Sequence, residues 1–247
     1  KMDKTNTLTL FGVYQPIEDK FLPVLNGKDV DASSQAANGF RLVEQTEYGA
    51  SAYYSGDFGK TNLQGYFIWK KMDFDEKKII PESNINTFGG RIKTPFSDAV
   101  TLTAEASYQF GTIGDFNRAA YGGYAYVDIK TGSDKVFLPK TVTIGSLALS
   151  GDDPSTPDYE GWDPVFGRWP KWSESFVYNN PKEFGRTSNW SNIFDLFIKF
   201  DFAVMKEIDI TLQNHFLLAM QQQLKTAFLS GEGTNRGNLT ADRKSVV

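Results

Sequence analysis

The chain has 247 residues, no cysteine and a formal net charge of -4. These totals exclude disulfide and thiolate chemistry, and they argue against a nucleic-acid partner, which would favour a basic surface. Mean hydropathy is -0.38, and no apolar run reaches the length of a transmembrane helix.

Alternation of apolar and polar residues with a period of two predicts a series of β-strands along the chain. A tenth strand is expected to begin near Asn235. The nine strands before it are predicted at 5–14, 44–58, 62–74, 85–94, 99–111, 118–130, 136–150, 191–204 and 208–222.

The last two predicted strands have the clearest pattern. Large apolar residues such as Phe194 and Ile198 occupy the even positions, whereas Asp195, Lys199 and Asp201 occupy odd positions. Both arms are longer than the about 9–11 tilted residues that cross a bilayer. The pair therefore reads as a membrane-spanning hairpin with one lipid-facing and one water-facing side.

The connections between the predicted strands alternate between short and long. Short connections are typical of the periplasmic end of an outer-membrane barrel, and long ones of its extracellular end. The sequence thus predicts an all-β, antiparallel, up-and-down transmembrane β-barrel, as one domain over 1–247. Short turns are expected at 59–61, 96–98, 132–134 and 206–207, and long loops at 15–43, 75–84, 112–117, 151–187 and 224–234.

We expect the chain to be a fragment, because Lys1 begins inside what reads as a turn and the last residues end where a further strand should begin. The last six residues, 242–247, read DRKSVV. This string matches the translation of a common sequencing adapter, so we expect a non-native tail. A genuine polar chain end is the alternative.

Charged residues of the predicted strands lie opposite the large apolar side chains. A base facing lipid at the bilayer midplane costs about 2–4 kcal/mol, so these residues are expected to line a polar lumen. The electric field between acids and bases across that lumen would select solutes. The alternative is that they brace the wall as cross-strand pairs. Arg91, Arg118 and Lys199 are the preferred selective set. The candidates are Arg91, Lys93, Glu105, Arg118, Asp128, Lys130, Asp195, Lys199 and Asp201.

The sequence offers little for catalysis or metal binding. His215 is the one histidine in the chain, and its face supplies no nucleophile at a useful spacing, so a lumen histidine in a polar network is expected. The acidic run at 151–158 matches no standard calcium motif. We therefore expect neither an enzymatic step, nor a metal, nor a cofactor.

The segment 151–187 is predicted to be a long extracellular loop. Three of the five tryptophans lie in it, interleaved with two bases. Because indoles are costly to leave in water, the loop is expected to fold on itself or into the barrel mouth. Stacking indoles and carboxylate-binding bases would suit an acidic sugar, and a loop core that narrows the pore is the alternative. The candidates are Trp162, Arg168, Trp169, Lys171 and Trp172.

Two motifs carry a resemblance to a known family. SGDDPSTPDYEGWDP at 150–164 and GRWPKWSE at 167–174, with SGEGTNRGN further on, resemble the alginate-export family of outer-membrane barrels, in particular its Bacteroidetes-type members. The resemblance covers nearly all of 1–240 and implies the C-terminal portion of a monomeric barrel of about 18 strands. It also implies an arginine-lined pore for a polyuronate, from which the mixed loop charges of this chain depart.

The sequence therefore predicts a passive channel, or porin, in the bacterial outer membrane. Polar or anionic solutes would diffuse through it, with an acidic poly- or oligosaccharide such as alginate as the first substrate and a general small-solute porin close behind. The expected partners are outer-membrane lipid and lipopolysaccharide and the solute. The alternative is a carbohydrate-binding β-sheet surface protein that uses the tryptophan-rich loop.

Overall fold

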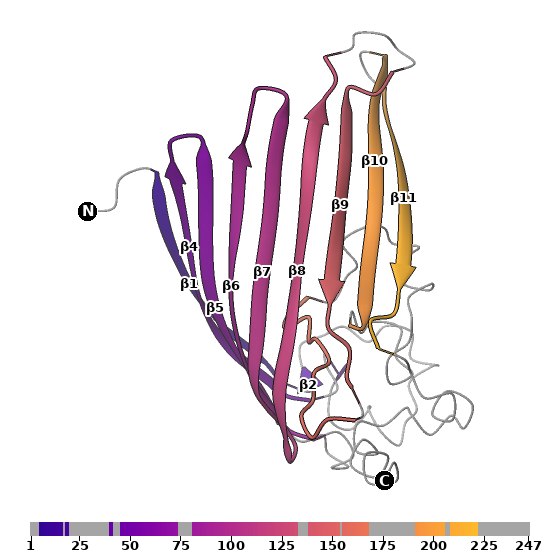
Figure 1. Cartoon of the computed structure of the whole chain (residues 1–247). Coiled ribbons are helices and arrows are strands. Elements are labelled where there is room, and N and C mark those ends of the chain that lie inside the picture. Colours follow the sequence, from indigo (N-terminus) through magenta and orange to yellow (C-terminus); the bar gives the residue numbers. More distant parts are fainter. Residues whose placement is uncertain are drawn as a thin grey trace.

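Nine antiparallel strands form one up-and-down sheet (Figure 1). The computed structural model describes residues 5–16, 18–19, 40–41, 45–73, 81–132, 138–153, 155–167, 191–205 and 208–221. Within these ranges the chain is all-β, and no helix is long and apolar enough to cross a membrane. The strands of the sheet are β1 (Asn6–Gln15), β4 (Glu47–Phe58), β5 (Thr61–Met72), β6 (Ser83–Pro95), β7 (Val100–Ile113), β8 (Phe116–Lys130), β9 (Thr141–Leu149), β10 (Ile193–Met205) and β11 (Ile208–Leu218).

The strands pair in chain order, so β1 and β11 are the two edges of the sheet. Figure 1 shows the strands side by side in a curved wall. Two short strands that the sequence did not predict, β2 (Glu18–Asp19) and β3 (Phe40–Arg41), lie between β1 and β4 in the sequence. They pair with each other in a separate two-stranded sheet. All nine predicted strands are confirmed, whereas the tenth, near Asn235, lies outside the described residues.

Two connections differ from the prediction, so short and long connections do not alternate without exception. The expected loop at 112–117 is a tight turn: Ile113 pairs with Phe116, and Gly114 takes the first turn position with φ +55°, as in two-residue hairpins. The connection from β8 to β9 is longer than expected because β9 begins at Thr141, not near residue 136. Pro139 precedes it, and a proline cannot donate to the ladder of a central strand.

The two faces of the sheet differ in chemistry. Because paired residues share a face, one cross-strand row contains Arg91, Glu105 and Tyr124, and we call that side the polar face. The opposite side is the apolar face, and the exposed large apolar side chains of β4 to β11 lie on it. They include Phe58, Leu63, Phe67, Phe88, Tyr108, Phe110, Tyr121, Ile129, Ile144, Leu196, Ile210, Leu212, Phe216 and Leu218.

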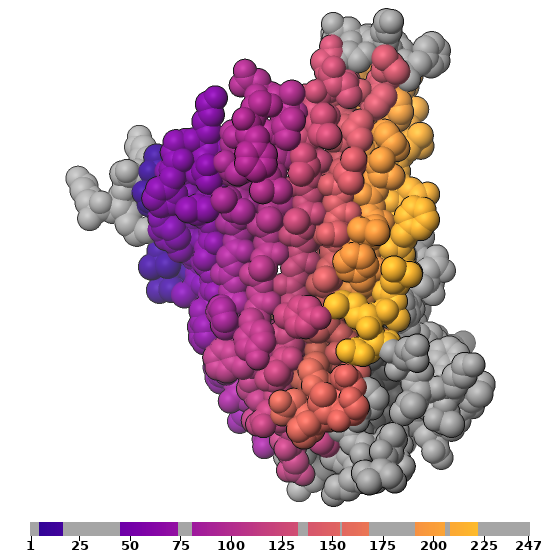
Figure 2. All heavy atoms as spheres, viewed as in Figure 1, coloured from indigo at the N-terminus to yellow at the C-terminus, as the bar shows by residue number. Residues whose placement is uncertain are grey.

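Side chains of neighbouring strands form a nearly continuous surface from β4 to β11 (Figure 2). On the apolar face, Phe67, Phe88, Tyr108 and Tyr121 occupy one row across β5 to β8. The Phe88 ring centroid lies 5.8 Å from that of Tyr108. This row is therefore an exposed aromatic band on the sheet.

The buried core of the molecule lies on the polar face, where the loop after β9 covers it. Trp162 of this loop packs against a cluster of Leu147, Leu149 and Ile193. The sheet thus buries side chains under a loop and leaves its apolar face uncovered, which reverses the usual arrangement of a water-soluble sheet.

Candidate functional site

The loop segment 150–167 is attached to the sheet first through β8. Tyr159 N–H donates to the Asn117 carbonyl at 2.7 Å, and Ala119 N–H donates to the Tyr159 carbonyl at 3.0 Å. Tyr159 and Arg118 thereby form a parallel bridge beside β8, where β9 has already ended. The loop therefore takes the place of a strand partner for the end of β8.

Arg118 fixes the next part of the loop. Its guanidinium donates to the Gly161 carbonyl at 2.6 Å and lies 4.8 Å from the Tyr159 ring centroid, a cation–π distance. The side chain is 3% exposed. In the structure the guanidinium of Arg118 is thus directed at the loop backbone and the Tyr159 ring.

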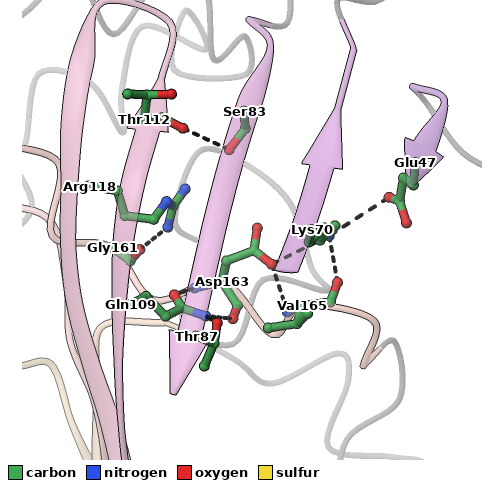
Figure 3. A network of polar contacts seen from close by, with 10 residues as sticks. All are labelled: Glu47, Lys70, Ser83, Thr87, Gln109, Thr112, Arg118, Gly161, Asp163 and Val165. Atoms are coloured by element: carbon green, nitrogen blue, oxygen red, sulfur yellow. Dashed lines mark hydrogen bonds and ion pairs between the residues drawn. The ribbon is translucent and has the colours of Figure 1, made fainter. Parts of the chain in front are cut away.

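A buried charged cluster holds the tip of the segment (Figure 3). Lys70 Nζ of β5 lies 3.4 Å from Asp163 Oδ1 of the loop and 3.9 Å from Glu47 Oε1 of β4. All three residues are at most 6% exposed. Lys70 also donates to the Val165 carbonyl and lies 5.5 Å from the Phe166 ring centroid. Buried charges are tolerated in a protein when ion pairs and hydrogen bonds of this kind replace the lost contacts with water.

Gln109 of β7 binds the backbone of the loop. Its amide nitrogen donates to the Asp163 carbonyl at 2.7 Å, and Asp163 N–H donates to the Gln109 amide oxygen at 2.9 Å. The same amide nitrogen reaches Thr87 Oγ1 at 3.2 Å. The side-chain amide of Gln109 thus exchanges two hydrogen bonds with the Asp163 backbone, as a residue of a neighbouring strand would. These bonds fix the position of Asp163 relative to β7.

Two glycines give the loop room to approach the polar face. A β-carbon on Gly49 would lie 2.3 Å from the Phe166 ring, and one on Gly122 would lie 3.0 Å from the Trp162 ring. The rings therefore rest where side chains of the polar face would otherwise project. The described part of the loop, as far as residue 167, therefore packs closely on the polar face of the sheet.

Beyond the loop, a network of tyrosines surrounds a cross-strand charged pair. Arg91 and Glu105 are direct neighbours on β6 and β7. Arg91 Nε donates to the Tyr124 hydroxyl at 3.1 Å, and the Tyr66 hydroxyl donates to Glu105 Oε1 at 2.7 Å. All four side chains are partly exposed.

The remaining sequence candidates on β6 and β10 lie on the same face. Lys93 is exposed in the row next to Arg91. Lys199 and Asp201 form an ion pair of 2.9 Å along β10. Asp195 is fully buried and meets His215 Nδ1 at 2.7 Å. Asp195 and His215 thus pair across neighbouring strands, whereas Lys199 and Asp201 pair along one strand and Lys93 is exposed.

Asp128 and Lys130 complete the set on β8. Asp128 accepts a hydrogen bond from the Thr143 hydroxyl at 2.7 Å, and Lys130 is exposed. The candidates Arg168, Trp169, Lys171 and Trp172 lie outside the described residues.

The acidic side chains at the start of the loop accept hydrogen bonds from other residues of the same loop. Asp153 Oδ1 accepts from Ser155 N–H at 2.9 Å, and Asp152 Oδ1 accepts from Glu160 N–H at 3.2 Å. Among the residues that the structure describes, no group of three or more histidine, cysteine, aspartate or glutamate side chains is placed to hold a metal ion.

Sequence reasoning missed Lys70, Gln109 and Asp163 as members of the site. Alternation puts Lys70 and Gln109 on the polar face, but it does not show that a loop covers them. No family model, curated protein or solved structure matches this chain.

Proposed function

We propose that this sheet is part of the wall of a bacterial outer-membrane channel, through which polar or anionic solutes diffuse without an enzymatic step. The single observation that carries the proposal is the contrast between the two faces: large apolar side chains are exposed on one side, while Arg91, Lys93, Glu105 and the loop segment 150–167 lie on the other. Exposed apolar patches of this extent mark contact with lipid or with a partner. In a transmembrane barrel they face lipid.

The dimensions and aromatic positions of the strands support this proposal. The strands have 9 to 15 residues, and about 9–11 tilted residues cross the hydrocarbon core. On the apolar face, the row through Phe88 and Tyr121 lies toward the loop end, whereas Phe58 and Phe96 are exposed toward the opposite end. Outer-membrane barrels carry aromatic girdles at both interfaces in the same way.

The polar face would form the lumen. Lys93 and Arg91 would contribute positive charge to it, and the docked loop would narrow it at one end. The resemblance of the loop motifs makes an acidic poly- or oligosaccharide the first substrate to test, and a general porin would admit small solutes without preference. Lipid and lipopolysaccharide would cover the apolar face.

Barrel closure is part of the proposal. Edge strands β1 and β11 leave backbone groups that hydrocarbon cannot satisfy, so they would have to be paired in the membrane. Further strands of a larger monomeric barrel would supply those partners. The alternative, a carbohydrate-binding surface protein, gains no support from Trp162, because its indole packs against Leu149 and Ile193 rather than forming an open platform.

Site-directed spin labelling tests the proposal. The chain has no cysteine, so single cysteines can be introduced at Phe88 and Leu212 on the apolar face, and at Thr101 and Lys93 on the polar face. In outer membranes that contain the natural gene product, the first two labels should be accessible to oxygen dissolved in lipid, and the last two to a water-soluble nickel chelate. Nickel access at all four positions would overturn the proposal.

A further inference from the structure

Two parallel tyrosine pairs lie on the polar face beyond the docked loop. Tyr53 and Tyr66 stack at 5.1 Å between ring centroids with planes 5° apart, and Tyr124 and Tyr126 stack at 5.9 Å with planes 14° apart. The first pair lies on β4 and β5, and the second on β8. All four side chains are partly exposed, so their rings are accessible from the polar side.

Hydrogen bonds to the intervening Arg91 and Glu105 hold one ring of each pair in place. The Tyr66 hydroxyl donates to Glu105 at 2.7 Å, and the Tyr124 hydroxyl accepts from Arg91 at 3.1 Å. Gly89, the cross-strand neighbour of Tyr66, leaves space for its ring: a β-carbon there would lie 2.5 Å from the hydroxyl end of Tyr66. Little conformational freedom would therefore be lost when a ligand binds.

The charges around the tyrosines do not favour an anion. The row of Arg91 and the two rows beside it contain two basic side chains, Arg91 and Lys93. The same rows contain two acidic side chains that are at least partly exposed, Asp57 and Glu105, and a third, Asp195, that is fully buried against His215. A polyanion in contact with these rows would therefore meet as many acidic as basic side chains, so charge alone would not retain it.

We infer that these tyrosines form a binding site for a neutral, hydroxyl-rich ring, that is, a neutral saccharide unit. The apolar C–H face of such a ring packs on an aromatic face, while its hydroxyls can both donate and accept hydrogen bonds. Arg91 and Glu105 supply a donor and an acceptor side by side for those hydroxyls. This inference rests on the proposed channel and specifies a substrate class at one height of its wall.

Single-channel recording on the natural gene product tests the inference. The probes are a glucose oligosaccharide and a uronic acid oligosaccharide of equal length. We expect saturable block by the neutral probe at lower concentration than by the acidic one. Tyr66→Leu should raise the half-blocking concentration of the neutral probe about tenfold, the equivalent of one stacking contact, whereas Tyr66→Phe, which keeps the ring, should retain most of the block.

Tyr108→Leu is the matched control, since Tyr108 lies on the apolar face of β7, and it should not change the block. Heat-modifiable migration in gels reports whether each variant has folded. Conductance that is blocked by the acidic probe alone, or that is blocked equally well in folded Tyr66→Leu, would overturn the inference and leave the channel intact. Absence of any conductance would overturn the proposed function itself.

Discussion

The indole of Trp162 lies against Gly122 so closely that a β-carbon at position 122 would come within 3.0 Å of two ring atoms. We predict that Gly122→Ala destabilises the protein by about 1–3 kcal/mol, the usual cost of overpacking. Urea unfolding followed by tryptophan fluorescence measures this change. Gly65→Ala is the control, because no atom lies within 4 Å of a β-carbon there. Equal losses in both variants would contradict the prediction.

Removing the charge of Lys70 should be far more costly than removing that of its neighbour. Lys70→Met leaves the carboxylates of Glu47 and Asp163 buried without their shared base, and breaking a buried pair costs about 3–5 kcal/mol. Lys71→Met breaks an exposed pair whose side chains are 43% and 38% accessible, worth at most about 1 kcal/mol. The free energies of unfolding of the Lys70→Met and Lys71→Met variants, each compared with the unsubstituted protein, test this prediction. Similar losses in the two variants would show that the buried cluster adds no stability.

The environment of the apolar face can be tested by a single charge. Ala106→Arg places a base on the exposed apolar side of β7. If that side faces lipid, the substitution should lower folding stability in vesicles by about 2–4 kcal/mol. If it faces water, the change should stay within about 0.5 kcal/mol. Thr101→Arg, on the polar face of the same strand, is the matched control and should have a small effect in either case.

Ion selectivity should respond to Lys93. This side chain is exposed on the polar face, so Lys93→Glu reverses a charge that the proposed lumen would present to solutes. We expect the cation-to-anion permeability ratio to rise on the order of twofold, as the local potential changes sign. The reversal potential in a salt gradient measures it. Lys60→Glu alters a turn residue with an 82% exposed side chain and should produce a smaller shift; the opposite order would place Lys93 outside the conduction path.

Strand positions and faces could be predicted because they depend on local alternation. β7 is the clearest case: Leu102, Tyr108 and Phe110 lie on one face, and Glu105 and Gln109 on the other, as the sequence indicates. The start of β9 differs from the prediction because the apolar residues before Pro139 have a strand-like pattern, whereas that proline has no N–H to donate to the ladder. The tight turn at Gly114 was not predicted because the alternation reverses just before it: Thr112 lies on the apolar face and Ile113 on the polar face, so the pattern ends at residue 111.

The docked loop could not be predicted in the same way. Lys70 and Asp163 are 93 positions apart, and no periodic pattern links a loop carboxylate to a strand lysine at that separation. A weak signal was present at Gly49 and Gly122, where the polar face lacks a side chain. Such gaps indicate that another group approaches the backbone, but they do not identify Trp162 or Phe166 as that group.

The contact between Asp163 and Lys70 also has a kinetic consequence. We expect the sheet, whose strands pair in chain order, to form from local hairpins before this contact, which joins residues 93 positions apart. Interactions that form after the transition state affect mainly the unfolding rate. Loss of Lys70 should therefore shorten the lifetime of the folded wall while the rate of its assembly stays the same.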